Sequence, residues 1–326
     1  MKRFLALILI SAFVIVIFPV ALLKDSINPE ENVFVPQTST PQTTESTNTL
    51  TVFRSVTQEN IEIDFFEYVC GSVAAEMPLS YHEEALKAQA IACYTNALRL
   101  KSLSENNSAY HITDDSSTHQ GYLNKEQREE KWGDDFSEYE AKLEGIVKSV
   151  ENLAIYYDNE LCVAAFHAIS SGKTESAENI WGEKAPYLTS VKSTGDNLSP
   201  QYSSVVAFEK DDFLEIAKEL TKSDNIKNLK SVIEIKDKSK SGTVLKVTLN
   251  KKEFTGEEIR KAFSLRSPVF TVTTTEKTVT FNVTGYGHGV GMSQYGAYGM
   301  AKHYEKTYKD ILGFYYSEVG LSFGKN

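Results

Sequence analysis

The chain has 326 residues, of which 41% are apolar, and a formal net charge of −10. A chain of this length and composition can bury one or two sizeable cores. Its negative charge gives no support for a polyanionic partner such as nucleic acid. Cys70, Cys93 and Cys162 lie in separate apolar runs without CxxC spacing. Neither a disulfide framework nor a structural zinc site is therefore expected.

The N-terminus carries an uncharged apolar segment. Lys2 and Arg3 precede residues 4–23, which contain no charged side chain. A helix of about 20 apolar residues matches the roughly 30 Å hydrocarbon core of a bilayer. The segment is longer than a signal-peptide core and lacks a small-x-small site, which favours a retained anchor over a cleaved signal. Residues 1–24 are predicted to form a cytoplasmic tip and a single transmembrane anchor, with the rest of the chain extracytoplasmic.

Residues 25–50 differ from both neighbouring regions in composition. They are rich in Thr, Ser, Pro, Gln and Asn and contain few large apolar residues. Such a segment cannot bury enough apolar surface to offset the entropy of ordering it. It is predicted to be a flexible linker, followed by a folded domain over residues 51–326.

The folded domain is predicted to begin with two helices. Residues 63–76 are apolar and helix-compatible, and Pro78 ends this helix because proline disfavours helical backbone at the residue before it. Ser80 stands three residues before Glu83, an arrangement typical of a capping box that opens a second helix. This second helix is expected to run to about Leu100. The pair forms a helical hairpin, with the last residue of the first helix at its turn.

The remaining pattern predicts an α+β fold: a mixed helical and β body, with residues 201–284 a candidate for a small α/β lobe. A Lys-rich stretch over 218–240 is interleaved with Asp and Glu, which is typical of a solvated surface. The expected elements are a helix at 136–150, a β-hairpin from 154–157 and 161–166, a strand at 203–208, a helix at 211–220, strands at 232–235 and 244–249, a short helix from 255, strands at 269–274 and 279–283, and helices around 297–304 and 308–316.

Glu76 is the first candidate for chemistry. It ends a helix among Val73, Ala74, Ala75 and Met77. Apolar surroundings and the partial negative charge of a helix C-terminus both disfavour its ionised form and raise its pKa. A carboxylic acid that remains protonated near neutral pH can donate its proton to a leaving oxygen. The alternative is an ordinary exposed glutamate at a helix end.

A glycine-rich segment over residues 286–299 is the second candidate. Six of the chain's 18 glycines lie between positions 285 and 299. Alternating glycines allow tight turns and a close approach to a ligand. His288 and Gln294 offer hydrogen-bonding groups, and Tyr295 offers a flat apolar face for a sugar ring. The spacing matches neither a phosphate-binding nor a dinucleotide-binding loop. A purely structural glycine turn is the alternative.

A third polar segment, residues 166–175, follows the predicted hairpin. Ser170 and Glu175 are polar groups where a strand ends, a usual place for a binding loop. A nucleophilic Ser–His pair using His167 lacks a third orienting residue, and a simple polar turn is the alternative.

With these three segments in order, the chain resembles the stage II sporulation protein D family, which includes the amidase enhancers. The resemblance covers roughly residues 60–320. The matching residues are Tyr68-Val-Cys-Gly71, Ala75-Glu-Met-Pro78 and Glu84-Ala-Leu-Lys-Ala-Gln-Ala90, then Ser170, Gly172-Lys-Thr-Glu175, Trp181 and Pro186-Tyr-Leu188, then Gly287-His-Gly-Val-Gly-Met-Ser-Gln-Tyr-Gly-Ala297, Ile311-Leu312 and Tyr315-Tyr316.

The resemblance implies a peptidoglycan lytic transglycosylase of sporulation and engulfment, in which Glu76 is the catalytic residue and no cofactor is required. Its substrate would be peptide-stripped glycan strands, cleaved between MurNAc and GlcNAc, and its partners an amidase and membrane proteins. Because the 6-hydroxyl of MurNAc attacks its own C1, one carboxyl can serve first as acid and then as base. Groove contacts are expected from His288, Gln294, Tyr295, Ser170 and Glu175.

Two alternatives follow from the same residues. One is a catalytically silent, glycan-binding amidase enhancer. The other is a muramidase with two carboxylates, in which Glu175 supplies the second group.

The chain departs from the family pattern at three places. Tyr94-Thr95-Asn96 replaces Arg-Thr-Tyr or Arg-Thr-Phe, which removes an expected basic groove contact, and Ser170-Ser171-Gly172 replaces Ser-Gly-Gly. Some relatives hold zinc with cysteines in the segment that matches 114–120. Here that region has only His111 and His119, so no metal is expected.

Overall fold

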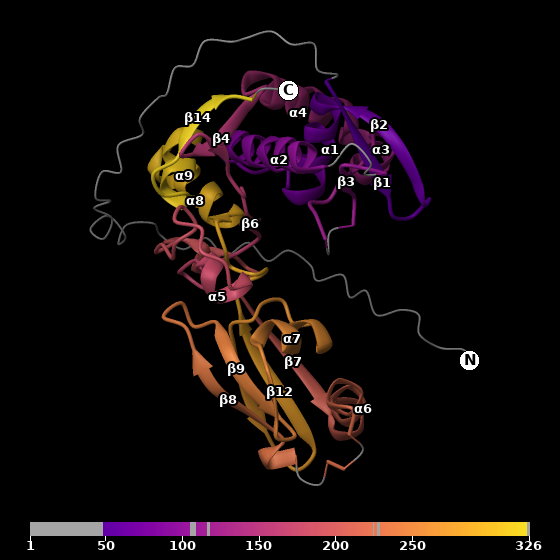
Figure 1. Cartoon of the computed structure of the whole chain (residues 1–326), viewed down its shortest axis with the longest axis vertical. Helices are drawn as coiled ribbons and strands as arrows, with labels where there is room; N and C mark the ends of the chain where they lie inside the picture. The colour runs from indigo at the N-terminus through magenta and orange to yellow at the C-terminus, as the bar shows by residue number, and fades with distance from the viewer. Residues whose placement is uncertain (1–47, 105–108, 116–117, 224, 227–228, 325–326) are drawn as a thin grey trace. The chain divides into compact units, whose positions relative to one another are not determined.

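The computed structural model describes residues 48–104, 109–115, 118–223, 225–226 and 229–324 (Figure 1). Within these residues the fold is α+β, as predicted. The predicted anchor and nearly all of the predicted linker lie outside the described residues. Within the described part of the chain, no helix is long and apolar enough to cross a bilayer.

A three-stranded sheet opens the described chain and was not predicted. Strand β1 (Thr49–Arg54) pairs antiparallel with β2 (Glu59–Asp64) and parallel with β3 (Ile112–Thr113). Thr49 precedes the expected start of the folded domain by two residues. Alternate side chains of β1 are buried, which explains why this short strand belongs to the folded part.

The predicted helical hairpin is present. Helix α1 (Phe65–Glu76) ends at Glu76, with Met77 in extended backbone as its C-cap, and α2 (Glu83–Leu103) follows. The predicted cap at Ser80 is wrong. Residues 78–81 form a turn closed by a backbone hydrogen bond, so Ser80 is inside this turn. The N-cap is instead His82, whose ring nitrogen accepts the N–H of Glu84.

Two further helices cover α1. The predicted helix α4 is present at Phe136–Ser149, whereas α3 (Lys125–Trp132) was not predicted because its charged sequence lacks an apolar period. A 3₁₀ turn, η1 (Gly133–Asp135), separates them. Arg128 of α3 is fully buried and forms ion pairs with Glu67 of α1 (2.9 Å) and Glu140 of α4 (2.6 Å). This network joins the three helices.

The rest of the body is built from short strands and two C-terminal helices. The predicted hairpin forms between β4 (Leu153–Tyr157) and β5 (Glu160–Leu161), although its second strand has only two residues. Strand β14 (Gly320–Phe323) pairs with β4, and β6 (Phe166–His167) pairs with β13 (Met292–Ser293). Helices α8 (Gln294–Tyr304) and α9 (Tyr308–Tyr315) pack on α2. A short helix, α5 (Ala177–Trp181), follows the third polar segment.

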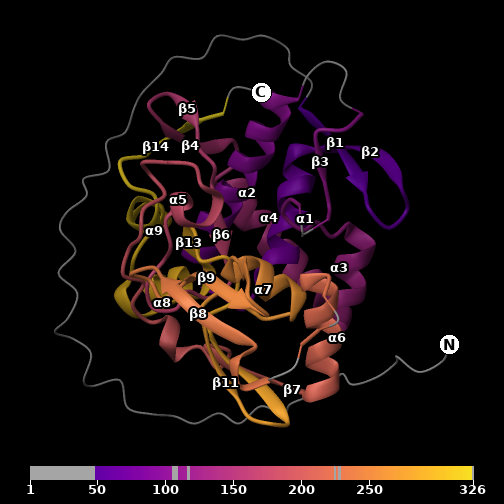
Figure 2. The same ribbon diagram turned by 60° about the horizontal axis from the view of Figure 1, so that its bottom comes forward.

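Residues 203–284 form a group of elements with a hydrophobic core of their own (Figures 1 and 2). The large aromatic residues Phe213, Phe263 and Phe281 lie at its centre. Strands β7, β12 and β11 make one antiparallel sheet, and β8, β9 and β10 make another. The elements are β7 (Ser203–Glu209), α6 (Lys210–Thr221), β8 (Ile233–Lys238), β9 (Val244–Leu249), β10 (Lys252–Phe254), α7 (Gly256–Ala262), β11 (Phe270–Thr274) and β12 (Thr278–Thr284).

Candidate active site

Glu76 is held at the end of α1 by a single hydrogen bond. The side chain is half-buried, and its Oε1 accepts the backbone N–H of Gly121 at 2.6 Å. Among the described residues, none forms a hydrogen bond or ion pair with Oε2. The carboxyl group therefore has one oxygen fixed by the protein and one available to a ligand.

The backbone that touches Glu76 is positioned by two side-chain amides. Gln120, next to Gly121, donates to the backbone oxygen of Cys93 (3.0 Å) and accepts from Asn96 (3.4 Å). A Cβ atom at position 121 would lie 3.2 Å from Oε1 of Glu76 and 3.1 Å from the Cβ of Ala75. Glycine therefore permits the close approach of this loop. Asn96 was noted above only as a departure from the family pattern, and its role as an anchor for the loop was missed.

Burial raises the pKa of Glu76 above its ordinary value, as the sequence predicted. The Gly121 N–H and the positive charge of Lys131 act in the opposite direction and are the smaller effects. The Lys131 ammonium donates to the backbone oxygen of Ala74 at 2.7 Å, in the last turn of α1. A partly buried carboxyl with a raised pKa can hold a proton at a pH where an exposed glutamate has lost it.

Three tyrosines connect the turn after Glu76 with the glycine-rich segment. Tyr81 stacks on Tyr298 with ring centroids 4.6 Å apart, and Tyr295 lies edge-on to both rings, at 6.1 Å from Tyr81 and 5.6 Å from Tyr298. All three are half-buried, and the Tyr295 hydroxyl donates to the backbone oxygen of Leu198. Tyr81 was missed because nothing in its local sequence indicates which residues it meets.

The other two predicted groups of the glycine-rich segment form hydrogen bonds within the protein. Gln294 is 5% exposed and donates to Gln89 of α2 at 3.4 Å. The Nδ1 atom of His288 accepts the N–H of Val290 at 3.0 Å. Burial, together with the positive charge of Arg260, lowers the pKa of His288 to about 4, so its ring is neutral near pH 7.

Ser170 belongs to a buried network around one aspartate. Its hydroxyl donates to Asp196 at 2.7 Å, and Asp196 also accepts from Ser293 (2.5 Å) and Ser193. The carboxylate is fully buried, and burial raises its pKa. Asp196 was not predicted, yet it joins the second and third motifs because Ser170 belongs to one and Ser293 to the other.

Glu175 is 2% exposed, and both of its oxygens accept hydrogen bonds. Oε1 accepts from the Ser176 N–H and the Asn179 amide, each at 2.8 Å, and Oε2 accepts from the hydroxyl of Ser239. Because Ser239 follows β8, Glu175 joins the body to residues 203–284.

Three histidines that the sequence analysis considered and did not assign to the site form contacts within the protein. His167 is 4% exposed and its Nδ1 lies 3.1 Å from the backbone oxygen of Val290, while its other nitrogen, Nε2, has no hydrogen-bond partner. The Nδ1 atoms of His111 and His119 accept the N–H groups of Thr51 and Thr113. No group of three potential metal ligands occurs among the described residues.

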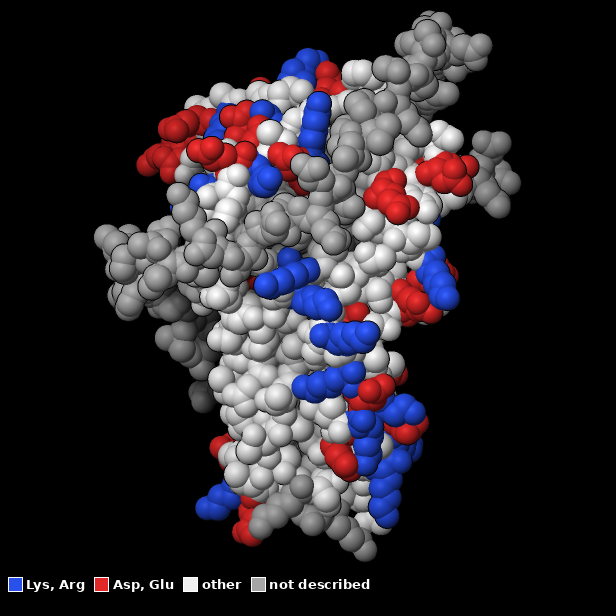
Figure 3. Space-filling model, turned by 90° about the vertical axis from the view of Figure 1, so that its left-hand side faces the viewer, with Lys and Arg blue, Asp and Glu red and all other residues white. Residues whose placement is uncertain are grey.

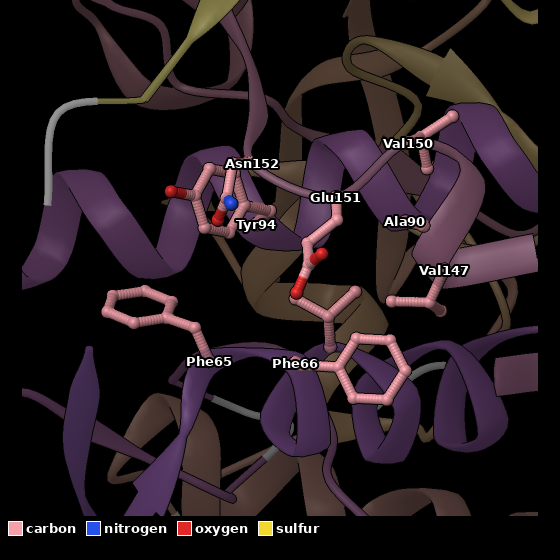
Figure 4. Close-up of a pocket in the computed structure, with 9 residues that line it drawn as sticks. Phe65, Phe66, Ala90, Tyr94, Val147, Val150, Glu151 and Asn152 are labelled. Atoms are coloured by element: carbon pink, nitrogen blue, oxygen red, sulfur yellow. The ribbon is translucent and has the colours of Figure 1, made fainter.

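Tyr94, in α2, contacts the start of α1, whereas Glu76 is at the end of α1. Tyr94 packs edge-to-face on Phe65, the first residue of α1, with ring centroids 5.4 Å apart. Both residues line a small, mainly apolar pocket together with Phe66 and Glu151 (Figure 4). The tyrosine that replaces the family's arginine is therefore part of this packing and not of the surroundings of Glu76.

Comparison with known proteins identifies the family. A family model described as "Stage II sporulation protein" matches residues 54–157, and a domain of unknown function, DUF8618, matches residues 208–291. The chain is 35% identical over 288 residues to stage II sporulation protein D of Bacillus amyloliquefaciens, covering 86% of this chain and 81% of that protein.

Two further relatives agree with this result. The chain is 37% identical over 279 residues to stage II sporulation protein D of Bacillus subtilis (strain 168), covering 83% of this chain and 78% of that protein. The amidase enhancer of the same organism is 27% identical over 304 residues, covering 77% of this chain and 40% of that protein. On the strength of the two long alignments above 30% identity, this chain belongs to the stage II sporulation protein D family.

Proposed function

We propose that the chain is a peptidoglycan lytic transglycosylase that cleaves the MurNAc–GlcNAc linkage of peptide-stripped strands during sporulation. The observation that carries the proposal is the half-buried Glu76, whose pKa is raised by burial and whose Oε2 is open to a ligand. Oε1 accepts the N–H of Gly121, which leaves Oε2 as the oxygen that carries the proton. Oε2 protonates the leaving oxygen, and the resulting carboxylate takes the proton of the attacking 6-hydroxyl of MurNAc.

The tyrosine cluster supports a carbohydrate substrate. Tyr81, Tyr295 and Tyr298 are partly exposed aromatic rings, and Tyr81 stands five positions after Glu76. Flat apolar faces, one of them on the turn that follows the catalytic carboxyl, suit the faces of sugar rings. We assign the direct sugar contacts to these rings. The polar atoms of His288, Gln294, Ser170 and Glu175 are bonded within the protein, so we assign these residues to the framework of the site.

The setting proposed for this activity is the outer face of the cell membrane. Residues 4–23 are an apolar segment preceded by Lys2 and Arg3, which suits a single anchor with the enzyme domain outside. An amidase that removes stem peptides would supply the substrate. The similarity to an amidase enhancer is consistent with such an association.

The direct test is mass spectrometry of the products formed from amidase-treated peptidoglycan in water labelled with heavy oxygen. The wild-type ectodomain should release 1,6-anhydro ends without incorporation of the label. Reducing ends that carry the label would replace this mechanism with that of a two-carboxylate muramidase. Glu76→Gln keeps the volume of the side chain and an acceptor for the Gly121 N–H, and it should bind strands without cleaving them.

An amidase enhancer without activity is the second candidate, favoured by the similarity to the Bacillus subtilis amidase enhancer. It predicts that the wild type and Glu76→Gln are equally inactive on strands. Both proteins would then stimulate a purified amidase to the same extent.

A further inference from the structure

Two lysines face one another beside the second motif. Segments 172–174 and 191–193, neither of which is a strand, are joined by two backbone hydrogen bonds in an antiparallel pattern, each segment donating one N–H to the other at N···O distances of 2.8 and 3.1 Å. The two bonds flank the central residue of each segment. Lys173 therefore lies directly opposite Lys192, in a pair without mutual hydrogen bonds and with side chains on the same face.

This arrangement is electrostatically unfavourable for the chain by itself. Like charges directly opposite each other in an antiparallel pair are destabilising. Lys192 is exposed and Lys173 is half-buried, and within the described part of the chain no carboxylate forms an ion pair with either. The nearby Lys184, by contrast, pairs with Glu178 at 3.7 Å. Packing does not explain why two uncompensated cations share one face, whereas an anionic ligand would.

A third lysine lies in the neighbouring turn between β8 and β9. The Ser241 hydroxyl donates to the backbone oxygen of Thr174 at 2.7 Å, and the Ser171 hydroxyl donates to the backbone oxygen of Ser241 at 2.9 Å. The exposed Lys240 directly precedes Ser241, and it too forms no ion pair with a described carboxylate. Three cations from separate segments thus belong to one hydrogen-bonded junction.

The junction borders the residues of the proposed groove. Lys173 lines a small pocket together with Ser170, Gly287 and His288, which belong to the second and third motifs. In Figure 3, Lys and Arg side chains form a broken column on the face shown, and few Asp and Glu lie in its middle part. The chain as a whole carries a net charge of −10, so a positive surface of this kind runs against its composition.

We propose that Lys173 and Lys192, with Lys240 beside them, bind the free lactyl carboxylates of peptide-stripped glycan strands. The inference rests on the proposed function and names the feature of the strand that is recognised. Hydrolysis of the amide that joins the stem peptide to MurNAc leaves one carboxylate on the lactyl group of each disaccharide. A strand with its peptides intact has a neutral amide at the same place. The lysines therefore recognise the stripped strand by a carboxylate at the lactyl position, where its precursor has an amide.

The test measures binding on the Glu76→Gln background, so that strands remain uncut. Two ligands are compared: amidase-treated strands, and the same strands with their carboxylates converted to neutral methylamides. Lys173→Gln/Lys192→Gln should weaken binding of the charged strands about tenfold at low salt, as expected for two partly exposed ion pairs. The difference should shrink as salt is added. Neutralised strands should bind the parent and the double variant equally.

Matched controls are Lys184→Gln and Lys246→Gln, because each of these lysines already has an acidic partner. Both should leave the affinity for charged strands within about twofold. Equal binding of charged and neutralised strands by the parent would overturn the proposal. So would stronger competition by a glycerol phosphate polymer than by charged strands, which would assign the lysines to a phosphate ligand.

These outcomes are separate from those of the proposed function. Cleavage is scored in the wild type by its 1,6-anhydro products, whereas charge recognition is scored in a variant that cannot cleave. A wild type that cleaves charged and neutralised strands alike would retain the proposed function and remove the charge recognition.

Discussion

At the scale of single residues, the properties of Glu76 depend on one glycine. Position 121 brings its backbone N–H to 2.6 Å from Oε1, and any side chain there would meet the carboxyl group. The hydrogen bond stabilises the carboxylate, while burial stabilises the acid. The balance between these two effects sets the pH at which Glu76 can give up its proton.

Gly121→Ala should slow strand cleavage about tenfold or more, because a displaced N–H removes a hydrogen bond to a charged group, which contributes roughly 1.5–3 kcal/mol. Cleavage rates against pH provide the measurement. Gly145→Ala is the control, since Gly145 is inside α4 and an added Cβ would meet nothing within 4 Å. A Gly121→Ala enzyme with wild-type rates at every pH would contradict this role.

Glu76→Gln should be more stable than the wild type at neutral pH. Burial raises the pKa of Glu76 above its unfolded value, so ionisation weakens the folded state above the folded pKa and has no effect below the unfolded one. The advantage of the variant should therefore diminish as the pH falls towards the ordinary glutamate value of 4.5. Urea denaturation over this range measures it, with Glu219→Gln, at an exposed position, as the matched control.

At the scale of elements, a buried ion-pair network holds α1 in place. Arg128 contributes all five of its side-chain hydrogen bonds to groups from α1, α4 and the loop before α3. The orientation of α1 determines where Glu76 points, so α3 and α4 affect the candidate site without touching it.

Arg128→Met should destabilise the fold by about 3–5 kcal/mol, because it leaves the buried carboxylate of Glu140 without its partner. Chemical denaturation gives the value. Arg260→Met removes a more exposed arginine that pairs with Glu257 at 2.9 Å, and it should cost less than about 1 kcal/mol. Similar losses of unfolding free energy in the two variants would show that the burial of Arg128 does not increase the cost of removing it.

At the scale of the whole folded domain, Glu175 links the body of the fold to the elements of residues 203–284. Its Oε2 accepts from Ser239 at the end of β8, and its N–H donates to the backbone oxygen of Gly289 at 2.7 Å. The residue thereby connects the body with residues 203–284 and with the glycine-rich segment. Such a role explains why a carboxylate is retained in a nearly dry position.

Glu175→Ala should lower the free energy of unfolding by about 1–3 kcal/mol, since it leaves several donors without an acceptor. The folded fraction should still yield 1,6-anhydro products at low temperature. Glu178→Ala, three positions further along the chain in α5 and exposed, is the matched control. A folded Glu175→Ala protein that binds strands but no longer cleaves them would support the two-carboxylate muramidase.

Local patterns in the sequence determined most of the elements. The proline after Met77 ended α1, Thr255 and Glu258 formed the capping box of α7, and alternating apolar residues marked β9 and β12. These signals act between residues a few positions apart, so they can be interpreted without a fold. The strands β1 to β3 and helix α3 were missed, because short or highly charged segments gain their stability from distant partners.

The raised pKa of Glu76 also followed from the sequence. Its apolar neighbours and the end of its helix are all within a few positions along the chain. Tertiary structure alone decided the rest of the site. Gly121 reaches Glu76 across 45 positions, Tyr81 meets Tyr298, and Asp196 gathers serines from both later motifs. A hydrogen bond or ring contact between segments far apart leaves no periodic trace in either segment. The physical reason is that packing, and not propensity, brings these groups together.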